Sequence, residues 1–559
     1  MTIMTASFPN AIFRKACWIA ALSLTGAAVL LHFFSLTQAG GLWRDEIAIA
    51  NIATMPSWAE TFRALPHDHC PIVFPAVVRV WTALGWAQTD AGLRVLGLGI
   101  GLFLLASFWA ASRMMGKGLP LLSLAIVAVN PVVVRYGDSI RGYALGIAFI
   151  VLTMGLIWRF IEAPGVGRGL LAGVLAVVSV QTLYQNAFFL LAIGIGGVVV
   201  SLRQRQPAKA VGVLGIGVVA ALSLLPYVNP IRQAQNWWVV SQPGTNLEIT
   251  LDRLSKLNGP FFGVWVAVAV LAVVFGIGRA VLVPGRYPVR EGEDLPLFGS
   301  IALVLGAVGF GVFIQLTGLL TQTWYYLPAL CFTVVCCDAI VSRMHPVARI
   351  GVLVLAVAML IISISPSAYA ALRWRQTNGD LVAAQVARNA GADDLVIVHP
   401  WYFGLTYGYY YRGAAKWTTL PPIADYRFHR YDLIKEKLAM ANPIAPVMER
   451  VATTLRSGNR VWVVGRLPLL PPDGAAPAAA PPPAPNGPRG WDDQPYSQAW
   501  GLEFRRLLAD HVTNATVVVD PVTNSIPINP MERMTLVVAG GWKDSNQPVS
   551  TSNSETNKP

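Results

Sequence analysis

The chain has 559 residues, of which 54% are hydrophobic and only 13% are charged, roughly half the charged fraction of a soluble domain. This composition excludes an ordinary soluble protein and indicates one that crosses a membrane many times. The net charge of +13 comes mostly from residues 1–369, where basic residues exceed acidic ones by 10, and the sequence holds no basic patch with interleaved aromatic residues that would suit nucleic acid.

The first apolar run, residues 17–36, follows Arg14 and Lys15. A cleaved signal peptide has the same basic start, but its apolar core is shorter and ends at a small-residue cleavage site. We therefore expect a retained first membrane span.

Short basic loops separate the later apolar runs, and loops rich in Lys and Arg stay in the cytoplasm. Placing these loops and the N-terminus there predicts a polytopic α-helical membrane domain, residues 1–369, with everything after it on the outer side. About eleven spans are expected, at 17–36, 92–112, 119–134, 140–158, 169–182, 186–202, 210–229, 260–278, 296–316, 325–342 and 349–368.

One acidic residue, Asp338, lies inside an apolar run, which normally marks a functional position. It stands near the inner end of its span, one helical turn before Arg343, so we expect a local ion pair instead.

The segment between the first two spans, residues 37–90, is far longer than a connection requires, and long ordered loops are usually functional. Within it, residues 71–86 are apolar, but the run is short and Arg79 interrupts it. If this run crossed the membrane, the later basic loops would face outward. We therefore expect an amphipathic helix that lies on the outer surface.

From residue 370 the pattern alternates between helix and strand, which predicts a small outer-side α/β domain. Residues 468–488 carry nine prolines and indicate an extended linker or disordered insertion, and the polar tail 543–559 is expected to be disordered. The strands are expected at 395–399, 460–465, 516–520 and 534–540, and the helices at about 376–390, 443–457 and 499–510.

Acidic residues and arginines gather in two outer loops. The candidates in the first loop are Asp45 and Glu46, in the stretch WRDE, and Asp68 and His69, in the stretch HDHCP. The second loop is a short span junction, and its candidates are Arg135, Tyr136, Asp138, Arg141 and Tyr143.

Each candidate also has a simpler interpretation. Asp45 beside Arg44 could be a solvated loop pair, and His67-Asp68-His69 is a weak metal-ligand pattern. The two arginines of the second loop could be headgroup anchors. Taken together, the residues suit chemistry on a lipid-linked phosphate, because Arg stabilises a departing phosphate and a carboxylate accepts the proton of an attacking hydroxyl.

Four motifs, in this order, resemble those of membrane-embedded C-type glycosyltransferases that use polyprenyl-phosphate sugars. The bacterial relatives of protein mannosyltransferases and of the lipid A aminoarabinose transferase are the most similar branch. The motifs are WRDE (43–46), HCPIVFPAVVRVW (69–81), DSIRGYAL (138–145) and WYYLPAL (324–330). The chain departs from the family where Ser139 replaces a Glu, Trp324 replaces a late Arg, and Cys70 replaces the first Pro of His-Pro-Pro.

The resemblance implies an inverting transfer of a sugar from a polyprenyl-phosphate donor to an envelope acceptor, which is a lipid, a polysaccharide or a protein. The site would face the outer side of the bacterial cytoplasmic membrane, with membrane lipids as the surroundings. Asp45 would be the catalytic base, and Glu46 would support it or orient the acceptor. The remaining roles would be acceptor or sugar binding by Asp138, His69 and Asp68, and donor-phosphate binding by Arg141, Tyr143, Arg135 and Tyr136.

The resemblance leaves the cofactor open, because some members of the family use a divalent cation and others do not. No metal ligand is assigned on the sequence.

Two other classes of protein were weighed against the enzyme. A flippase or other transporter of lipid-linked sugars places polar residues at mid-bilayer on broken helices, often in repeated halves. Here the polar cluster lies at one membrane face, and the sequence shows no internal repeat. An envelope assembly protein would have no evident use for the long acidic first loop.

Overall fold

The computed structural model describes residues 10–116, 118–237, 246–259, 262–282, 292–317, 321–344, 346–470, 481, 493–519 and 527–544. Most of the expected linker 468–488 and of the tail 543–559 lies outside these described residues. The chain divides into two compact units, one that runs through Gln376 and one that begins at Thr377. Each unit is described by itself.

The first unit is a helical bundle that crosses the membrane. In its described part, eight helical segments are long and apolar enough to span a bilayer, and a ninth span results if the bent pair α16–α17 counts as one. The two helices of that pair meet at an angle of 63°. The long helices are α1 Asn10–Gln38, α5 Asp90–Gly116, α7 Tyr143–Glu162, α9 Asn186–Arg203, α10 Pro207–Leu222, α13 Phe262–Leu282, α14 Leu295–Thr317, α15 Leu327–Val341, α16 Pro346–Ser363 and α17 Pro366–Leu372.

Two of the eleven expected spans are short or broken. The run 119–134 forms a π-helical turn, η2 Ser123–Ala128, and a separate helix, α6 Pro131–Gly137. Pro131 lacks the N–H that a continuous helix needs, and the Asn130 side chain accepts hydrogen bonds from the Val132 and Val133 amides instead. The run 169–182 is α8 Val166–Val180, whose 15 residues rise by about 1.5 Å each and fall short of the ~30 Å hydrocarbon core.

The long first loop is folded. It contains α2 Arg44–Ala53, α3 Trp58–Ala64, η1 Leu65–His67 and α4 Val73–Ala83, and the last of these lies within the run where a surface helix was expected. The Arg79 side chain ties α4 to α2 and α3, because its Nη1 donates to the carbonyls of Ala53 and Met55 and to the Thr61 hydroxyl.

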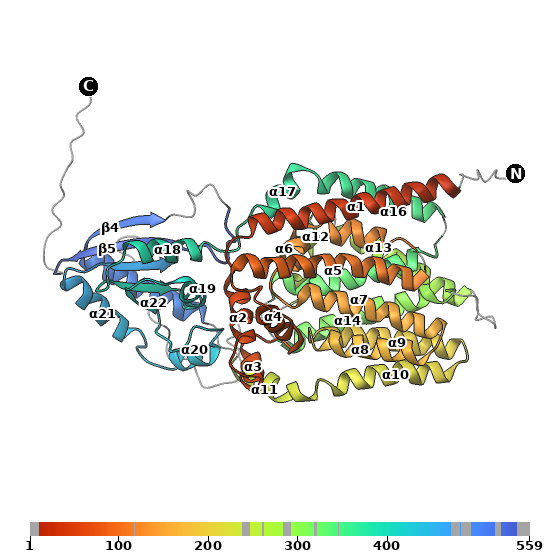
Figure 1. The fold of residues 1–559 in the computed structure, drawn as a ribbon, viewed down its shortest axis with the longest axis horizontal. Coiled ribbons are helices and arrows are strands. Elements are labelled where there is room, and N and C mark those ends of the chain that lie inside the picture. The colour runs from red at the N-terminus through yellow and green to blue at the C-terminus, as the bar shows by residue number, and fades with distance from the viewer. Residues whose placement is uncertain are drawn as a thin grey trace, which may run out of the picture. The chain divides into compact units, whose positions relative to one another are not determined.

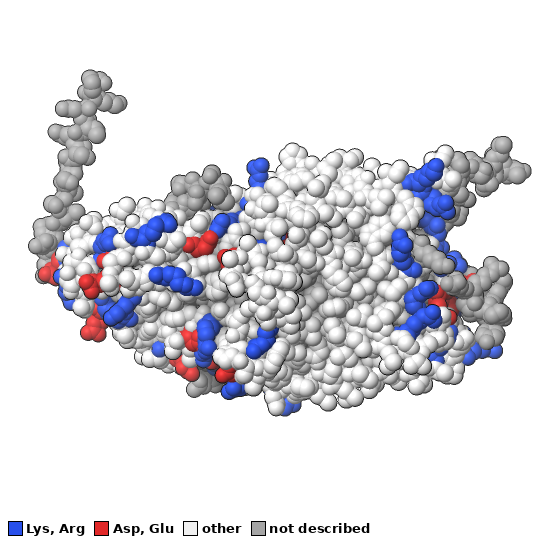
Figure 2. Space-filling view, in the orientation of Figure 1, with Lys and Arg blue, Asp and Glu red and all other residues white. Residues whose placement is uncertain are grey.

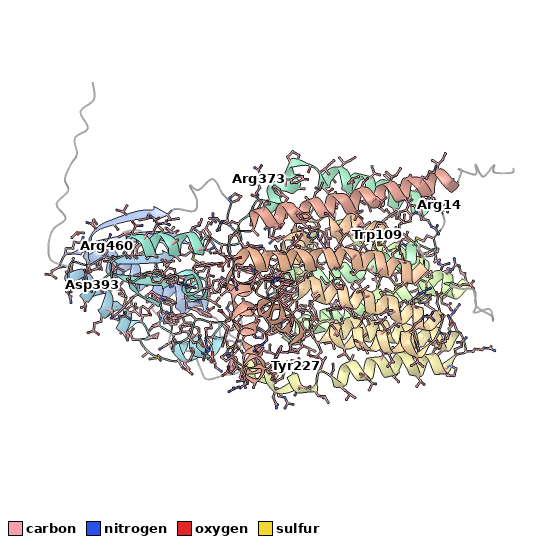
Figure 3. All side chains as sticks on the ribbon, viewed as in Figure 1. Arg14, Trp109, Tyr227, Arg373, Asp393 and Arg460 are labelled. Atoms are coloured by element: carbon pink, nitrogen blue, oxygen red, sulfur yellow. The ribbon has the colours of Figure 1, made fainter. Side chains whose placement is uncertain are left out.

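The two ends of the helical unit differ in charge. Figure 1 shows α2, α3 and α4 together at one end and the N-terminus at the other. In Figure 2, Lys and Arg gather at the N-terminal end, and the visible surface of the bundle between the ends is almost free of charge. Figure 3 places Arg14 at that basic end and Tyr227 at the end that carries the folded loop. Tyr227 supports the loop directly, because its hydroxyl accepts a hydrogen bond from the Ile72 amide.

Several shorter helices complete this unit. They are η3 Leu225–Tyr227, α11 Val228–Trp237, α12 Leu247–Asn258 and η5 Thr323–Tyr326. The last two pack together: the Tyr326 hydroxyl, on η5, lies 3.4 Å from the hydroxyl of Thr250, on α12.

The second unit is a five-stranded sheet, in the order β2-β1-β3-β5-β4, flanked by helices. The strands β1 Leu395–His399, β2 Lys416–Thr419 and β3 Val461–Gly465 are parallel, while β5 Thr535–Trp542 runs antiparallel to β3 and to β4 Val512–Val519. Strands β1 and β3 are buried along their whole length, as continuous apolar runs in parallel sheets are. The helices are α18 Gly379–Asn389, α19 Phe403–Tyr410, α20 Tyr431–Leu438, α21 Ala445–Arg456 and α22 Gln494–His511.

The expected fold class, a polytopic helical membrane domain followed by a small α/β domain, is confirmed. The sequence did not reveal β2, α19 or α20, which are four or eight residues long and too short for a clear period. Asp338 does not form the expected ion pair with Arg343. Its carboxylate instead accepts hydrogen bonds from the Leu122 and Ser123 amides and from the Ser123 hydroxyl, at the start of η2.

Candidate active site

Asp45 lies in the first turn of α2, at the end of the bundle that carries the folded loop. A carboxylate in this position is stabilised by the partial positive charge of the helix N-terminus. The Asp45 side chain is 16% exposed, and its Oδ1 lies 3.7 Å from the Arg44 Nε. The Asp45 carboxylate is therefore largely sheltered but keeps a small exposed surface.

Glu46, the next residue, is fully buried and has a different environment. Its Oε1 accepts hydrogen bonds from the Arg94 Nη1 at 2.5 Å and from the Ile140 amide at 2.9 Å. Its Oε2 accepts from the Trp43 amide at 3.2 Å, which caps the start of α2. A carboxylate with both oxygens occupied and no exposed surface holds the structure in place and does not contact an acceptor.

Arg141 brings the second loop to the first. Its Nη1 donates to both carboxylate oxygens of Asp68, at 2.6 Å each, and to the backbone carbonyl of Asp45 at 3.1 Å. Burial by itself would lower the pKa of Arg141, but the negative charges of Asp68 and Asp45 raise that pKa well above its ordinary value. The guanidinium is thus a cation that is paired with Asp68 and held to the backbone of Asp45.

Aromatic side chains pack around these charges. Trp324, in η5, packs against Tyr136 with ring centroids 4.9 Å apart and edge-on against Trp43 at 5.5 Å. Tyr143 and Tyr325 lie 6.3 Å apart. Burial raises the pKa of Tyr136 to about 12, Arg135 opposes this rise, and the negative charge of Asp45 adds to it. These contacts bring three of the four sequence motifs into one site, since Trp43, Tyr143 and Trp324 belong to WRDE, DSIRGYAL and WYYLPAL.

The remaining motif supplies His69, and Asp68 directly precedes it. Asp68 is the partner of Arg141, so it neutralises a cation and does not lie free for a sugar. His69 is half-buried and has a left-handed backbone with φ of 53°, which turns the chain sharply between η1 and α4. Before it, His67 stacks on Trp237 of α11 with centroids 4.4 Å apart.

Two of the candidates point elsewhere in the structure. The Arg135 guanidinium donates to the Ala371 carbonyl and lies over the Trp374 ring at 4.6 Å, so it is engaged with α17 and the residues after it. Asp138 accepts a hydrogen bond from the His32 Nδ1 at 2.7 Å, between α1 and α5. Burial raises the pKa of Asp138, and His32 partly opposes the rise. The structure thus brings together Asp45, Asp68, Arg141, Tyr136 and Tyr143, but neither Arg135 nor Asp138 joins them.

Two functional candidates were missed in the sequence. Arg94 lies inside the apolar run of α5, and a charged residue in such a run is a signal that could have found it. Arg253, on α12, has a buried Nε with no hydrogen-bond partner among the described residues, and its Nη1 is 3.8 Å from Asp252. No sequence pattern pointed to Arg253, which lies on α12, the helix that packs on η5.

The described residues contain no group of three or more His, Cys, Asp or Glu side chains that could hold a metal ion.

Comparison with known proteins gave structural matches only. No protein-family model matches the sequence, and no curated protein matches it. ArnT from Cupriavidus metallidurans, solved with bound undecaprenyl phosphate, is 13% identical, and the match covers 80% of this chain and 92% of that one, with a TM-score of 0.50.

Two structures of the Archaeoglobus fulgidus oligosaccharyltransferase are also similar. The complex of AglB with an inhibitory peptide and a dolichol-phosphate is 10% identical over 82% of this chain and 70% of that one, with a TM-score of 0.46. The complex with Zn and sulfate is 12% identical over 80% and 67%, with a TM-score of 0.46. Scores this low carry no further argument, whereas the likeness to ArnT shows a shared fold.

Proposed function

We propose that this protein is a membrane glycosyltransferase that moves a sugar from a polyprenyl-phosphate donor to an envelope acceptor. The observation that carries the proposal is the meeting of Asp45, Asp68 and Arg141 at one end of the bundle, where the Arg141 guanidinium pairs with the Asp68 carboxylate and donates to the backbone carbonyl of Asp45. The fold shared with ArnT, whose solved structure holds undecaprenyl phosphate, supports a lipid-linked donor.

Asp45 is the catalytic base in this proposal. Its carboxylate takes the proton from an acceptor hydroxyl, and the hydroxyl oxygen forms a bond to the anomeric carbon of the donor sugar. The bond between that carbon and the phosphate oxygen breaks on the opposite face, so the configuration inverts. The polyprenyl phosphate leaves with the electron pair of the broken bond.

The departing phosphate needs positive charge and hydrogen-bond donors. Arg141 supplies a guanidinium whose charge Asp68 partly offsets, and the rings of Tyr143 and Tyr325 lie close to each other in the same site. Arg253 is a further phosphate ligand in this proposal, because its buried Nε lacks an acceptor among the described residues. A phosphate oxygen would satisfy that N–H, which otherwise costs free energy.

The site faces the outer side of the cytoplasmic membrane in this proposal. The basic end of the bundle would lie in the cytoplasm, following the rule for positively charged loops. The chain leaves the bundle at the opposite end, because the Gln376 amide donates to the carbonyl of Ala39, just after the outer end of α1. The α/β unit would therefore lie in the periplasm.

Sugar transfer by the purified protein tests the proposal. The assay would supply undecaprenyl-phosphate-linked hexoses and pentoses together with envelope lipid, polysaccharide and protein fractions, with and without EDTA. We expect Asp45→Asn to fold and bind donor but to lose transfer by about 100-fold or more, the usual contribution of a positioned base. Arg141→Ala should weaken donor binding as well as turnover, since it meets the phosphate in the ground state too.

Asp393→Asn is a matched control, because Asp393 is an exposed acid of the α/β unit. It should transfer at the wild-type rate. Normal transfer by Asp45→Asn would show that Asp45 is an ordinary loop acid. Movement of the lipid-linked sugar across a vesicle without any transfer would instead identify a flippase.

A further inference from the structure

Two short backbone stretches of the site are joined reciprocally. The Arg141 guanidinium donates to the carbonyl of Asp45 at 3.1 Å, and the Glu46 carboxylate accepts from the amide of Ile140 at 2.9 Å. Residues 45–46 and residues 140–141 thus contact each other through two hydrogen bonds in opposite directions. This double contact fixes the distance between the proposed base and the proposed phosphate ligand.

Arg94 extends the contact to a membrane-spanning helix. Besides its 2.5 Å ion pair with Glu46, it donates to the carbonyl of Gly41 at 2.8 Å and to that of Gly40 at 3.3 Å. The loop that leads into α2 is therefore held against α5. Glu46 and Arg94 are buried, with 0% and 6% of their side chains exposed.

Stability alone does not explain such a pair. Removing two charges from water costs several kcal/mol each, and replacing a buried ion pair by apolar residues is often neutral or stabilising. What apolar side chains cannot supply is a directed acceptor for the Ile140 amide. The pair therefore contributes position rather than net folding free energy.

We infer that Glu46 and Arg94 are positioning residues that fix the position of Asp45 relative to Arg141. The inference rests on the proposed function, in which the base and the phosphate ligand act on opposite sides of one anomeric carbon. A displacement of about 1 Å in such an arrangement can cost roughly 100-fold in rate. Neither residue touches substrate, so their loss should act on turnover and leave donor binding nearly intact.

The test compares two double variants that both lack the buried charges. Glu46→Met/Arg94→Met removes the acceptor for the Ile140 amide, whereas Glu46→Gln/Arg94→Met keeps an acceptor of similar length at position 46. We expect both variants to fold, because neither leaves a buried charge without its partner. The kcat of the Met variant should be about 100-fold below that of the wild type, with donor KM within about threefold of wild type. The kcat of the Gln variant should be at least about tenfold higher than that of the Met variant.

Hydrogen exchange of the Ile140 amide gives a readout that does not depend on sugar transfer. Its protection should fall in the Met variant and return in the Gln variant. Equal exchange and equal kcat in the two variants would overturn the inference. If the wild-type protein itself transfers no sugar, the proposed function fails, while exchange at Ile140 still decides whether Glu46 fixes the position of Asp45 relative to Arg141.

Discussion

Acidification should destabilise the α/β unit through one buried histidine. His399 ends β1, is 2% exposed, and its Nδ1 donates to the Leu420 carbonyl at 3.3 Å. Its Nε2 faces Gly501 of α22 so closely that a Cβ added there would lie 2.6 Å away. Burial lowers the pKa of His399 from 6.5 to about 4, and the Leu420 carbonyl partly opposes this. The folded unit thus holds this imidazole neutral.

The sign and size of the effect follow from proton binding. Below pH 6.5 the unfolded chain binds a proton at His399, whereas the folded unit binds one there only when the pH falls to about 4. Stability is therefore complete above pH 6.5 and declines as the pH falls through this window. Between pH 7.5 and pH 5 the loss amounts to about 2 kcal/mol, which is roughly a 30-fold increase in the population of the opened unit.

Hydrogen exchange of the β1 amides in the full-length protein measures this opening, after correction for the intrinsic pH dependence of exchange. The control is His399→Asn, because its amide nitrogen can still donate to Leu420 but does not titrate. The opening free energy of the wild type should fall with acidification by about 2 kcal/mol more than that of the variant. Parallel pH curves for the two proteins would refute the reasoning.

Two further predictions concern the helical unit. Gly101→Ala should destabilise the protein by about 1–3 kcal/mol, because the added Cβ would overlap the Asp138 carboxylate and approach the His32 ring to 2.7 Å. Gly99→Ala is the control, because its added Cβ would meet nothing within 4 Å, and it should have little effect on the thermal midpoint in detergent. Equal midpoints for the two variants would contradict the packing argument. A cysteine that replaces the exposed Ser57, at the start of α3, should react with an impermeant thiol reagent from outside intact spheroplasts. A cysteine that replaces Gly165, between α7 and α8, should react only after lysis. If the cysteine at position 165 reacts from outside and the one at position 57 does not, the proposed orientation of the site is wrong.

Much of the fold could be predicted because the membrane and the parallel sheet both impose simple patterns. Most of the long spans were found from apolar length alone, since a bilayer leaves few other ways to bury such runs. The limits of this signal appear at residues 119–134, where Pro131 and the Asn130 cap break a run that is mostly apolar. Hydropathy registers composition, and it does not register a missing backbone N–H.

The candidate site was only partly predictable. The order of four short motifs located Asp45 and Arg141, and the stretch HDHCP offered Asp68; the structure brings these three together. The second loop also suggested Arg135 and Asp138, whose side chains bind α17 and α1 instead. Position in a motif does not fix the direction of a side chain, because the partner that decides it lies more than 100 residues away in each case.

Sequence by itself determined that this chain is a polytopic membrane protein with a long, charged first loop and an α/β unit, since composition and periodicity follow from what must be buried. Only the tertiary structure decided what the adjacent carboxylates do. Asp45 remains accessible beside Arg141, while Glu46 is fully enclosed and occupied by Arg94 and Ile140. The two residues are adjacent in sequence, but a helix turns successive side chains by about 100°, so that one faces the site and the other faces the bundle.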